Sequence, residues 1–112
     1  LNDMKLRSST VNAIKLGMRD LTTTGELSGY FKSCVVEAGA KTGTAQLGKN
    51  IKNNGVFICF APYDNPKIAL AIVIEKGGAG ANLASTAVKI INAYFTASQA
   101  GTSVTGDNQL LN

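Results

Sequence analysis

The sequence predicts an α+β fold: a helix, a three-stranded antiparallel sheet and a C-terminal helix, in that order. Two longer segments carry apolar residues at helical spacing, and three short apolar segments lie between them. A chain of 112 residues is enough for one domain or part of one, but not for two. We expect the ordered part to span residues 1–96. Residues 97–112, rich in Ser, Thr, Gly, Asn and Gln, are predicted to be a flexible tail.

The first helix is predicted over residues 9–22. Apolar residues recur there at three- and four-residue spacing and predict one buried face: Val11, Ile14, Met18 and Leu21. Ser8 or Ser9 is expected to cap the helix, because a hydroxyl can accept from the free amides of the first turn. Three threonines and a glycine at 22–25 are expected to end it.

The sheet is predicted from residues 35–46, 56–61 and 67–75. The connection 47–55 is rich in Gly and Asn, which is turn chemistry, and Pro-Tyr-Asp-Asn-Pro at 62–66 suits a tight hairpin. The second and third strands are apolar on successive residues, so we expect both faces to be buried. Helices should therefore cover both sides of the sheet.

The two cysteines test the register of the first hairpin. If its strands pair directly, Gln46 lies near Gly55, and Cys59 lies opposite Thr42. Cys34 would then be about 26 Å further along at about 3.3 Å per residue, so a disulfide needs another topology. We expect two buried free thiols. With two Cys and no His we expect no metal site, and we expect no cofactor.

The second helix is predicted over residues 82–97, with Asn82 as its N-cap. Its main apolar stripe is Ala84, Val88, Ile91 and Phe95. The preceding Gly-Ala-Gly at 78–80 imitates a dinucleotide-binding loop, but the third glycine and the later acidic residue are missing. We interpret these glycines as a flexible lead-in to the helix.

Charge excludes some functions. The net charge is +4, but the eleven basic residues are scattered, so we expect no nucleic-acid partner. The longest apolar run, residues 68–74, is too short to cross a bilayer. Glu37 and Glu75 are lone carboxylates near strand ends, and we interpret them as solvated charges rather than an acid/base pair.

One stretch gathers the chemistry: Lys41-Thr42-Gly43-Thr44-Ala45-Gln46. The lysine offers charge-assisted hydrogen bonds to an anion, and the two threonines offer hydroxyl donors. The glycine lets a substrate lie against the strand, and a backbone N–H beyond it can face a developing oxyanion. Alternation would put Lys41 and Thr44 on opposite faces, which an edge strand overcomes only in part. For the tripeptide alone, a surface strand ending in a turn is the simpler interpretation.

The six-residue stretch resembles the Lys-Thr-Gly (KTG) motif of the penicillin-binding proteins. Four further stretches resemble class B members of that family: Gly-Met-Arg at 17–19, Gly-Val-Phe to Phe-Ala-Pro at 55–62, Asp-Asn-Pro-Lys-Ile-Ala at 64–69, and the Gly-rich lead-in to a helix ending Ala-Tyr-Phe at 93–95. The resemblance covers residues 9–96. It implies the C-terminal part of a penicillin-binding or serine β-lactamase-like transpeptidase fold, with the KTG strand as one wall of the active site.

The resemblance also implies roles for the motif residues. Lys41 is implied to bind the substrate carboxylate and to support proton transfer. Thr42 and Thr44 are implied to contact that carboxylate, and the amide of Thr44 to be the second oxyanion donor. Catalysis is thus assigned to Lys41 and Thr44, and substrate binding to these three residues with Gly43 and Gln46. Gln46 is a neighbour on the same strand with a less defined role.

The sequence departs from the family pattern in one respect. No Ser is followed three residues later by Lys, and no Ser-x-Asn occurs. In the family both motifs lie upstream of the KTG strand. The resemblance therefore implies a fragment of a serine-type peptidoglycan D,D-transpeptidase that cross-links stem peptides. We expect the fragment alone to be inactive, since acylation needs the activated serine.

Two alternatives remain: a D,D-carboxypeptidase or serine β-lactamase, and a non-catalytic module that senses β-lactams or binds the wall. The implied partners are the peptidoglycan stem peptide, β-lactams and the upstream half of the same domain. The implied location is the extracytoplasmic face of the bacterial cell membrane, with the anchoring segment absent from this chain. Without the upstream half we expect an exposed apolar face and self-association of the fragment.

Overall fold

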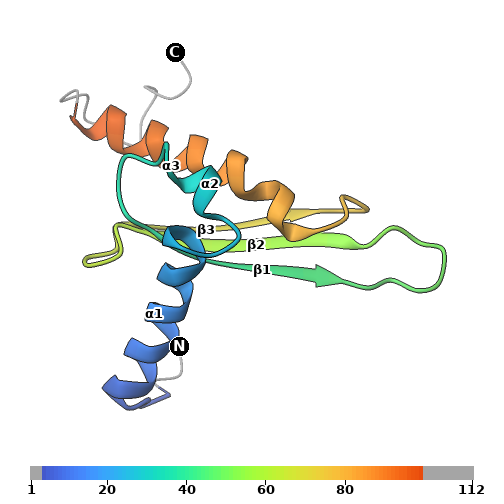
Figure 1. Ribbon diagram of the computed structural model, residues 1–112, viewed down its shortest axis with the longest axis horizontal. Coiled ribbons are helices and arrows are strands. Elements are labelled where there is room, and N and C mark those ends of the chain that lie inside the picture. Colours follow the sequence, from blue (N-terminus) through green and yellow to red (C-terminus); the bar gives the residue numbers. More distant parts are fainter. Residues whose placement is uncertain (1–3, 100–112) are drawn as a thin grey trace.

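The computed structural model describes residues 4–99 and confirms the α+β fold (Figure 1). A helix, a short helical turn, a three-stranded sheet and a final helix follow in order: α1 (Ser8–Thr23), α2 (Ser28–Phe31), β1 (Gly39–Ala45), β2 (Asn54–Ala61), β3 (Ile68–Ile74), the 3-10 turn η1 (Gly80–Leu83) and α3 (Ala84–Gln99). The strand order is β1-β2-β3, and both pairings are antiparallel.

The register of the first hairpin differs from the prediction by two residues. Thr44 lies opposite Gly55, and Cys59 lies opposite Ala40 rather than opposite Thr42. Because side chains alternate with a period of two, this shift leaves every residue on its predicted face. Both cysteines are free thiols as expected, but only Cys59 is buried, while Cys34 is half-buried.

The connection between β1 and β2 explains the shift. β1 ends at Ala45, so Gln46 begins the loop instead of lying on the strand as predicted. The loop takes up residues 46–53, and Gly48 and Asn50 have positive φ of 142° and 63°. These are the residue types that tolerate such angles, so the predicted turn chemistry is confirmed. Closing the loop this way adds residues 54 and 55 to the predicted strand.

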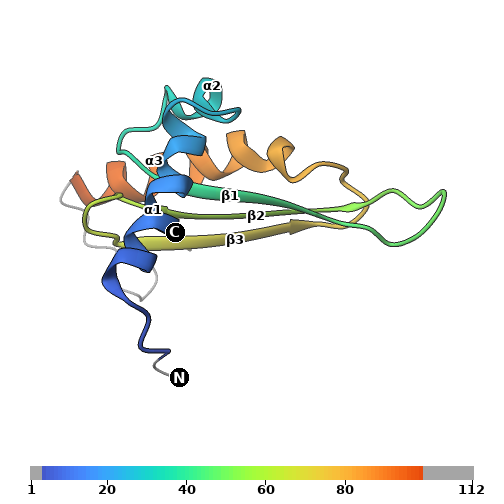
Figure 2. The same cartoon turned by 60° about the horizontal axis from the view of Figure 1, so that its bottom comes forward.

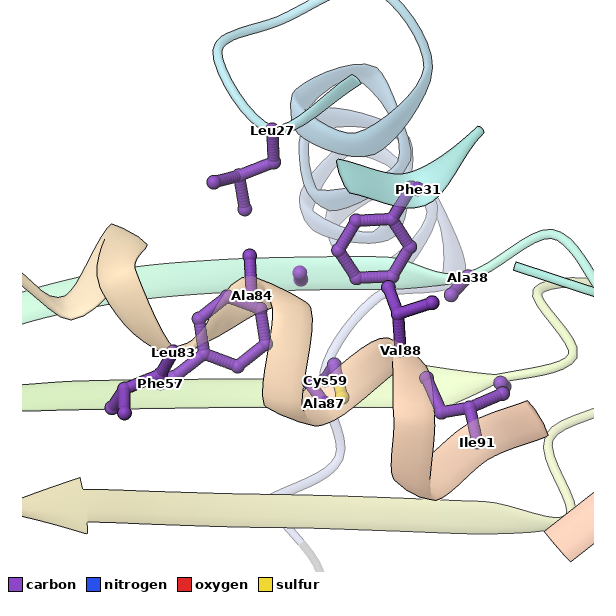
Figure 3. Packing of buried hydrophobic residues seen from close by; sticks show 12 residues of the cluster. Leu27, Phe31, Ala38, Phe57, Cys59, Leu83, Ala84, Ala87, Val88 and Ile91 are labelled. Carbon is purple, nitrogen blue, oxygen red and sulfur yellow. The ribbon is translucent and has the colours of Figure 1, made fainter. Parts of the chain in front are cut away.

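One face of the sheet, here called the first face, carries the core. Phe57 and Cys59 of β2 point from it towards α2, η1 and α3 (Figure 3), and Ala61 belongs to the same buried cluster. The largest fully buried side chains are Phe57, Leu27 and Ile91. Ala84 and Ala87 are also fully buried, and their small side chains let α3 lie close to the strands. Apolar periodicity in the sequence thus predicted this layer correctly.

The other face of the sheet, here called the second face, is largely uncovered in the described residues. It is apolar over β2 and β3, yet Ile58 is 43% and Val73 is 61% exposed. Met18 of α1 approaches this face at its Phe60 end, where α1, β2 and β3 line an open cavity of about 360 Å³. The prediction that helices cover both sides is therefore wrong for this chain. The predicted exposed apolar face is confirmed.

The start of α1 also departs from prediction. Ser8 is the first helical residue, and Arg7 takes the N-cap position without a side-chain hydrogen bond. Val11 and Ile14 of the predicted buried stripe are exposed. Figures 1 and 2 show the reason, because the N-terminal half of α1 extends beyond the sheet. The pattern is amphipathic, but half of its apolar stripe has no partner among residues 4–99.

The C-terminal half of α1 is held to the rest of the fold by polar contacts. Thr22 is buried, and its hydroxyl lies 2.7 Å from the carbonyl oxygen of Ala38 and 2.9 Å from that of Arg19. Arg19 forms an ion pair with Glu37, with 2.7 Å between Nε and Oε1. The guanidinium of Arg19 also lies over the ring of Tyr63. These contacts fix the segment that leads into β1.

The final helix begins later than predicted. Residues 80–83 form η1, and Asn82 lies inside this turn instead of capping a helix. Asn92 of α3 binds the connector before β1, because its side chain accepts from the amide of Val35 and donates to the carbonyl of Ser33, both at 2.8 Å. α3 takes in the first three residues of the predicted tail, and residues 100–112 lie outside the described part.

Candidate active-site strand

The motif lies on β1, at one edge of the described sheet. Lys41 pairs with Ile58 and belongs to the second face, while Thr42 and Thr44 alternate to the other side. An edge strand presents unpaired backbone groups sideways. The expected edge position is therefore observed, and it gives a ligand access to the backbone as well as to side chains of both faces.

Lys41 is exposed and is not neutralised within the described residues. Its Nζ donates a hydrogen bond of 2.9 Å to the carbonyl oxygen of Thr42, the next residue. No carboxylate of residues 4–99 forms an ion pair with it. The ammonium group can exchange this contact with a backbone carbonyl for a charge-assisted hydrogen bond to an anion.

The threonines beside it are likewise available. Within the described part of the chain, the hydroxyls of Thr42 and Thr44 form no hydrogen bond, and Thr44 is exposed. Gly43 lies between them, and a Cβ there would be 3.6 Å from Cβ of Val56, which is an ordinary contact. Packing inside this chain therefore does not demand a glycine at this position. A glycine at position 43 would, however, leave space for a ligand to lie against β1.

The structure separates the other residues considered as an acid/base pair. Glu37 precedes β1 and pairs with Arg19, whereas Glu75 follows β3 and so lies at the opposite end of the sheet. No group of three potential metal ligands occurs among residues 4–99. No helix in that range is long and apolar enough to cross a membrane.

Sequence reasoning missed one residue behind the motif. Gly80, interpreted as part of a flexible lead-in, is buried against the backbone of β1 and β2. The strand before this stretch, β3, pairs antiparallel with β2. A dinucleotide-binding loop would instead follow a strand of a parallel βαβ unit. A glycine preceding an apolar helix is compatible with flexibility or with close packing, and the sequence carries no signal that separates the two.

Comparison with known proteins decides the family. The family model described as penicillin binding protein transpeptidase domain matches residues 1–96. The chain belongs to this family. Its predicted resemblance to class B penicillin-binding proteins is thereby confirmed, together with the partial transpeptidase fold.

Individual members of the penicillin-binding protein family are similar over short parts of their length. Penicillin-binding protein 2A of Bacillus subtilis is 32% identical over 83 residues, 66% of this chain and 12% of that protein. The peptidoglycan D,D-transpeptidase MrdA of Escherichia coli is 34% identical over 65 residues, 46% of this chain and 10% of that protein. The structure of PBP2 from Helicobacter pylori aligns with a TM-score of 0.73 and 26% identity, covering 86% of this chain and 18% of that one.

Proposed function

We propose that this chain is part of a peptidoglycan D,D-transpeptidase that cross-links stem peptides through an acyl-serine and is inhibited by β-lactams. The observation that carries the proposal is the KTG motif on an edge strand of a penicillin-binding protein fold. Among residues 4–99 its lysine contacts only a backbone carbonyl, and its threonine hydroxyls form no hydrogen bond. Similarity to a protein named peptidoglycan D,D-transpeptidase supports the same activity.

Each motif residue has a defined task in this proposal. Lys41 binds the carboxylate of the stem peptide or β-lactam and supports proton transfer. The hydroxyls of Thr42 and Thr44 bind the same carboxylate, and Gly43 lets the substrate lie along the strand. The amide of Thr44 donates to the oxyanion that forms when the serine attacks, a type of contact worth about 10²- to 10³-fold in rate. Gln46, at the start of the loop, borders the same edge.

The nucleophile comes from elsewhere in this proposal, since the 112 residues contain no Ser-x-x-Lys. The upstream half of the domain is the proposed partner, and it covers the second face and the exposed apolar stripe of α1. Uncovered, that apolar surface favours self-association of the isolated chain. The proposed setting is the extracytoplasmic face of the bacterial membrane, where stem peptides are cross-linked.

The test is covalent labelling with a fluorescent penicillin. Three samples are compared: the chain alone, the intact protein that carries it, and that protein with Lys41→Ala. We expect only the intact protein to label well, and Lys41→Ala to slow labelling about 10- to 100-fold, because a charge-assisted hydrogen bond is worth about 1.5–3 kcal/mol. Lys89→Ala, at an exposed position of α3, is the matched control and should label normally.

The other outcomes identify the alternatives. Labelling of the isolated chain would mean that one of its own serines is reactive, and the proposed division of the site would be wrong. An intact protein that is folded but never labels would favour the non-catalytic β-lactam-sensing or wall-binding module. Labelling followed by fast release, without cross-linked product, would favour a carboxypeptidase or β-lactamase.

A further inference from the structure

η1 lies directly behind the motif strand. Gly80, its first residue, is buried where η1 packs against both β1 and β2. A Cβ built on Gly80 would lie 2.5 Å from the carbonyl oxygen of Gly43 and 3.1 Å from its nitrogen, and closer still to the carbonyl oxygen of Val56. Gly43 and Val56 are register partners across the hairpin. The backbone of Gly80 therefore sits against one specific pair of the ladder.

This contact cannot adapt by side-chain rotation, because the three atoms nearest to the Cβ are all backbone atoms. Ordinary Cβ contacts begin at 3.4 Å. Alanine at position 80 would thus force η1 and the Gly43 peptide apart by about 1 Å, a displacement that can cost 10²-fold in rate when it occurs at reacting groups.

η1 is not free to absorb that displacement alone. The connector before it is tied to the start of β2, since the amide of Gly78 donates to the carbonyl of Asn53 at 3.0 Å and that of Lys76 donates to Oδ1 of Asn54 at 2.8 Å. The end of η1 is anchored in the core by Leu83, which is buried. Of the two strands that Gly80 contacts, β2 is central and β1 lies at the edge of the sheet. We therefore expect β1 to be the strand that moves.

We propose that Gly80 is a positioning residue: it sets the position of the Gly43–Thr44 peptide and thereby aims the amide of Thr44 at the oxyanion. This inference rests on the proposed function, in which that amide is an oxyanion donor. Of the three residues that bind the carboxylate, Lys41 and Thr42 lie before the displaced peptide and only Thr44 follows it, so carboxylate binding depends less on Gly80 than acylation does.

The test separates binding from acylation in the intact protein, using a chromogenic penicillin. For Gly80→Ala we expect the acylation rate constant to fall at least about tenfold, with little change in the dissociation constant of the non-covalent complex. Gly39→Ala, on the motif strand β1, is the matched control, because the nearest atoms to its Cβ belong to side chains: the ring of Phe60 at 2.7 Å, which can turn, and Cβ of Met18 at 3.2 Å. Gly29→Ala, with nothing within 4 Å, is the neutral control.

A second variant covers the case in which Gly80→Ala does not fold. A Cβ on Gly55 would lie 3.2 Å from the carbonyl oxygen of Gly78 and 3.4 Å from Cα of Gly80, so Gly55→Ala presses on η1 more gently. It should reduce the acylation rate constant more than Gly39→Ala does.

The outcomes are distinct. An unmodified protein that is never acylated refutes the proposed function. A protein that is acylated, while its folded Gly80→Ala or Gly55→Ala variant keeps the full acylation rate, refutes the positioning role. An equal loss of binding and acylation refutes it as well, because it would show a general distortion of the site.

Discussion

The hydroxyl of Thr22 makes a sharp test of how α1 is held. Thr22 is 4% exposed, and its partner Ala38, directly before β1, is 1% exposed. Thr22→Val keeps the shape and the β-branch but leaves the carbonyl of Ala38 without this 2.7 Å hydrogen bond. A buried acceptor that loses its partner costs about 1–3 kcal/mol. We expect the free energy of unfolding to fall by about 2 kcal/mol.

The chain offers a matched control one residue away. Thr23 is exposed, and its hydroxyl bonds the carbonyl of Arg19 at 3.0 Å, as that of Thr22 also does at 2.9 Å. Thr23→Val is therefore the same chemical change in the same turn of α1, and it removes the same type of hydrogen bond to Arg19. It differs in that no contact to Ala38 is lost. We expect it to cost less than about 0.5 kcal/mol.

Urea titration of the intact protein measures both variants, with an unchanged m-value showing that the unfolded states are comparable. The reasoning would be refuted by equal costs for Thr22→Val and Thr23→Val. In that case the buried contact between α1 and the start of β1 contributes nothing beyond the local helix bond.

Three further predictions use the same titration or sedimentation. Burial raises the pKa of Cys59 to about 11, so from about pH 9 to 11 only the unfolded thiol loses its proton. Over that range the free energy of unfolding should fall by about 1.4 kcal/mol per pH unit relative to that of Cys59→Ala. The same pH dependence of unfolding free energy in both proteins would contradict this. Asn92→Ala breaks two hydrogen bonds of 2.8 Å and should cost about 1–3 kcal/mol, whereas no loss would mean that water replaces them. Val73→Lys, unlike Thr86→Lys on α3, should reduce self-association of the isolated chain, and equal sedimentation of the two would exclude the second face as the contact.

The elements could be predicted from sequence because their patterns are local. Apolar periodicity located both long helices, and the Gly/Asn and Pro-rich turns located the hairpins. The register was missed by two residues because loop length is set by backbone angles at Gly48 and Asn50, which residue type permits but does not dictate.

The predictions that were wrong concern contacts between residues distant in sequence. Val11 and Ile14 have the spacing of buried residues, but the spacing does not say whether the surface that would bury them belongs to this chain. The motif itself was found because its chemistry is contiguous over six residues. Gly80 was missed because it lies 37 positions from Gly43, and nothing local marks the contact.

The meander order of the sheet has a consequence for folding during synthesis. Both strand pairings join neighbours in the chain, so each hairpin closes a short loop and can form early. Part of the cover of the first face, however, comes from η1 and α3, the last elements made among the described residues. Until Leu83 and Ala84 have left the ribosome, Phe57 lacks the neighbours that pack beside it in Figure 3, on a nascent sheet whose motif strand has a bare edge. Such a species is prone to aggregate, so slow translation between β3 and α3 should lower the yield of folded protein.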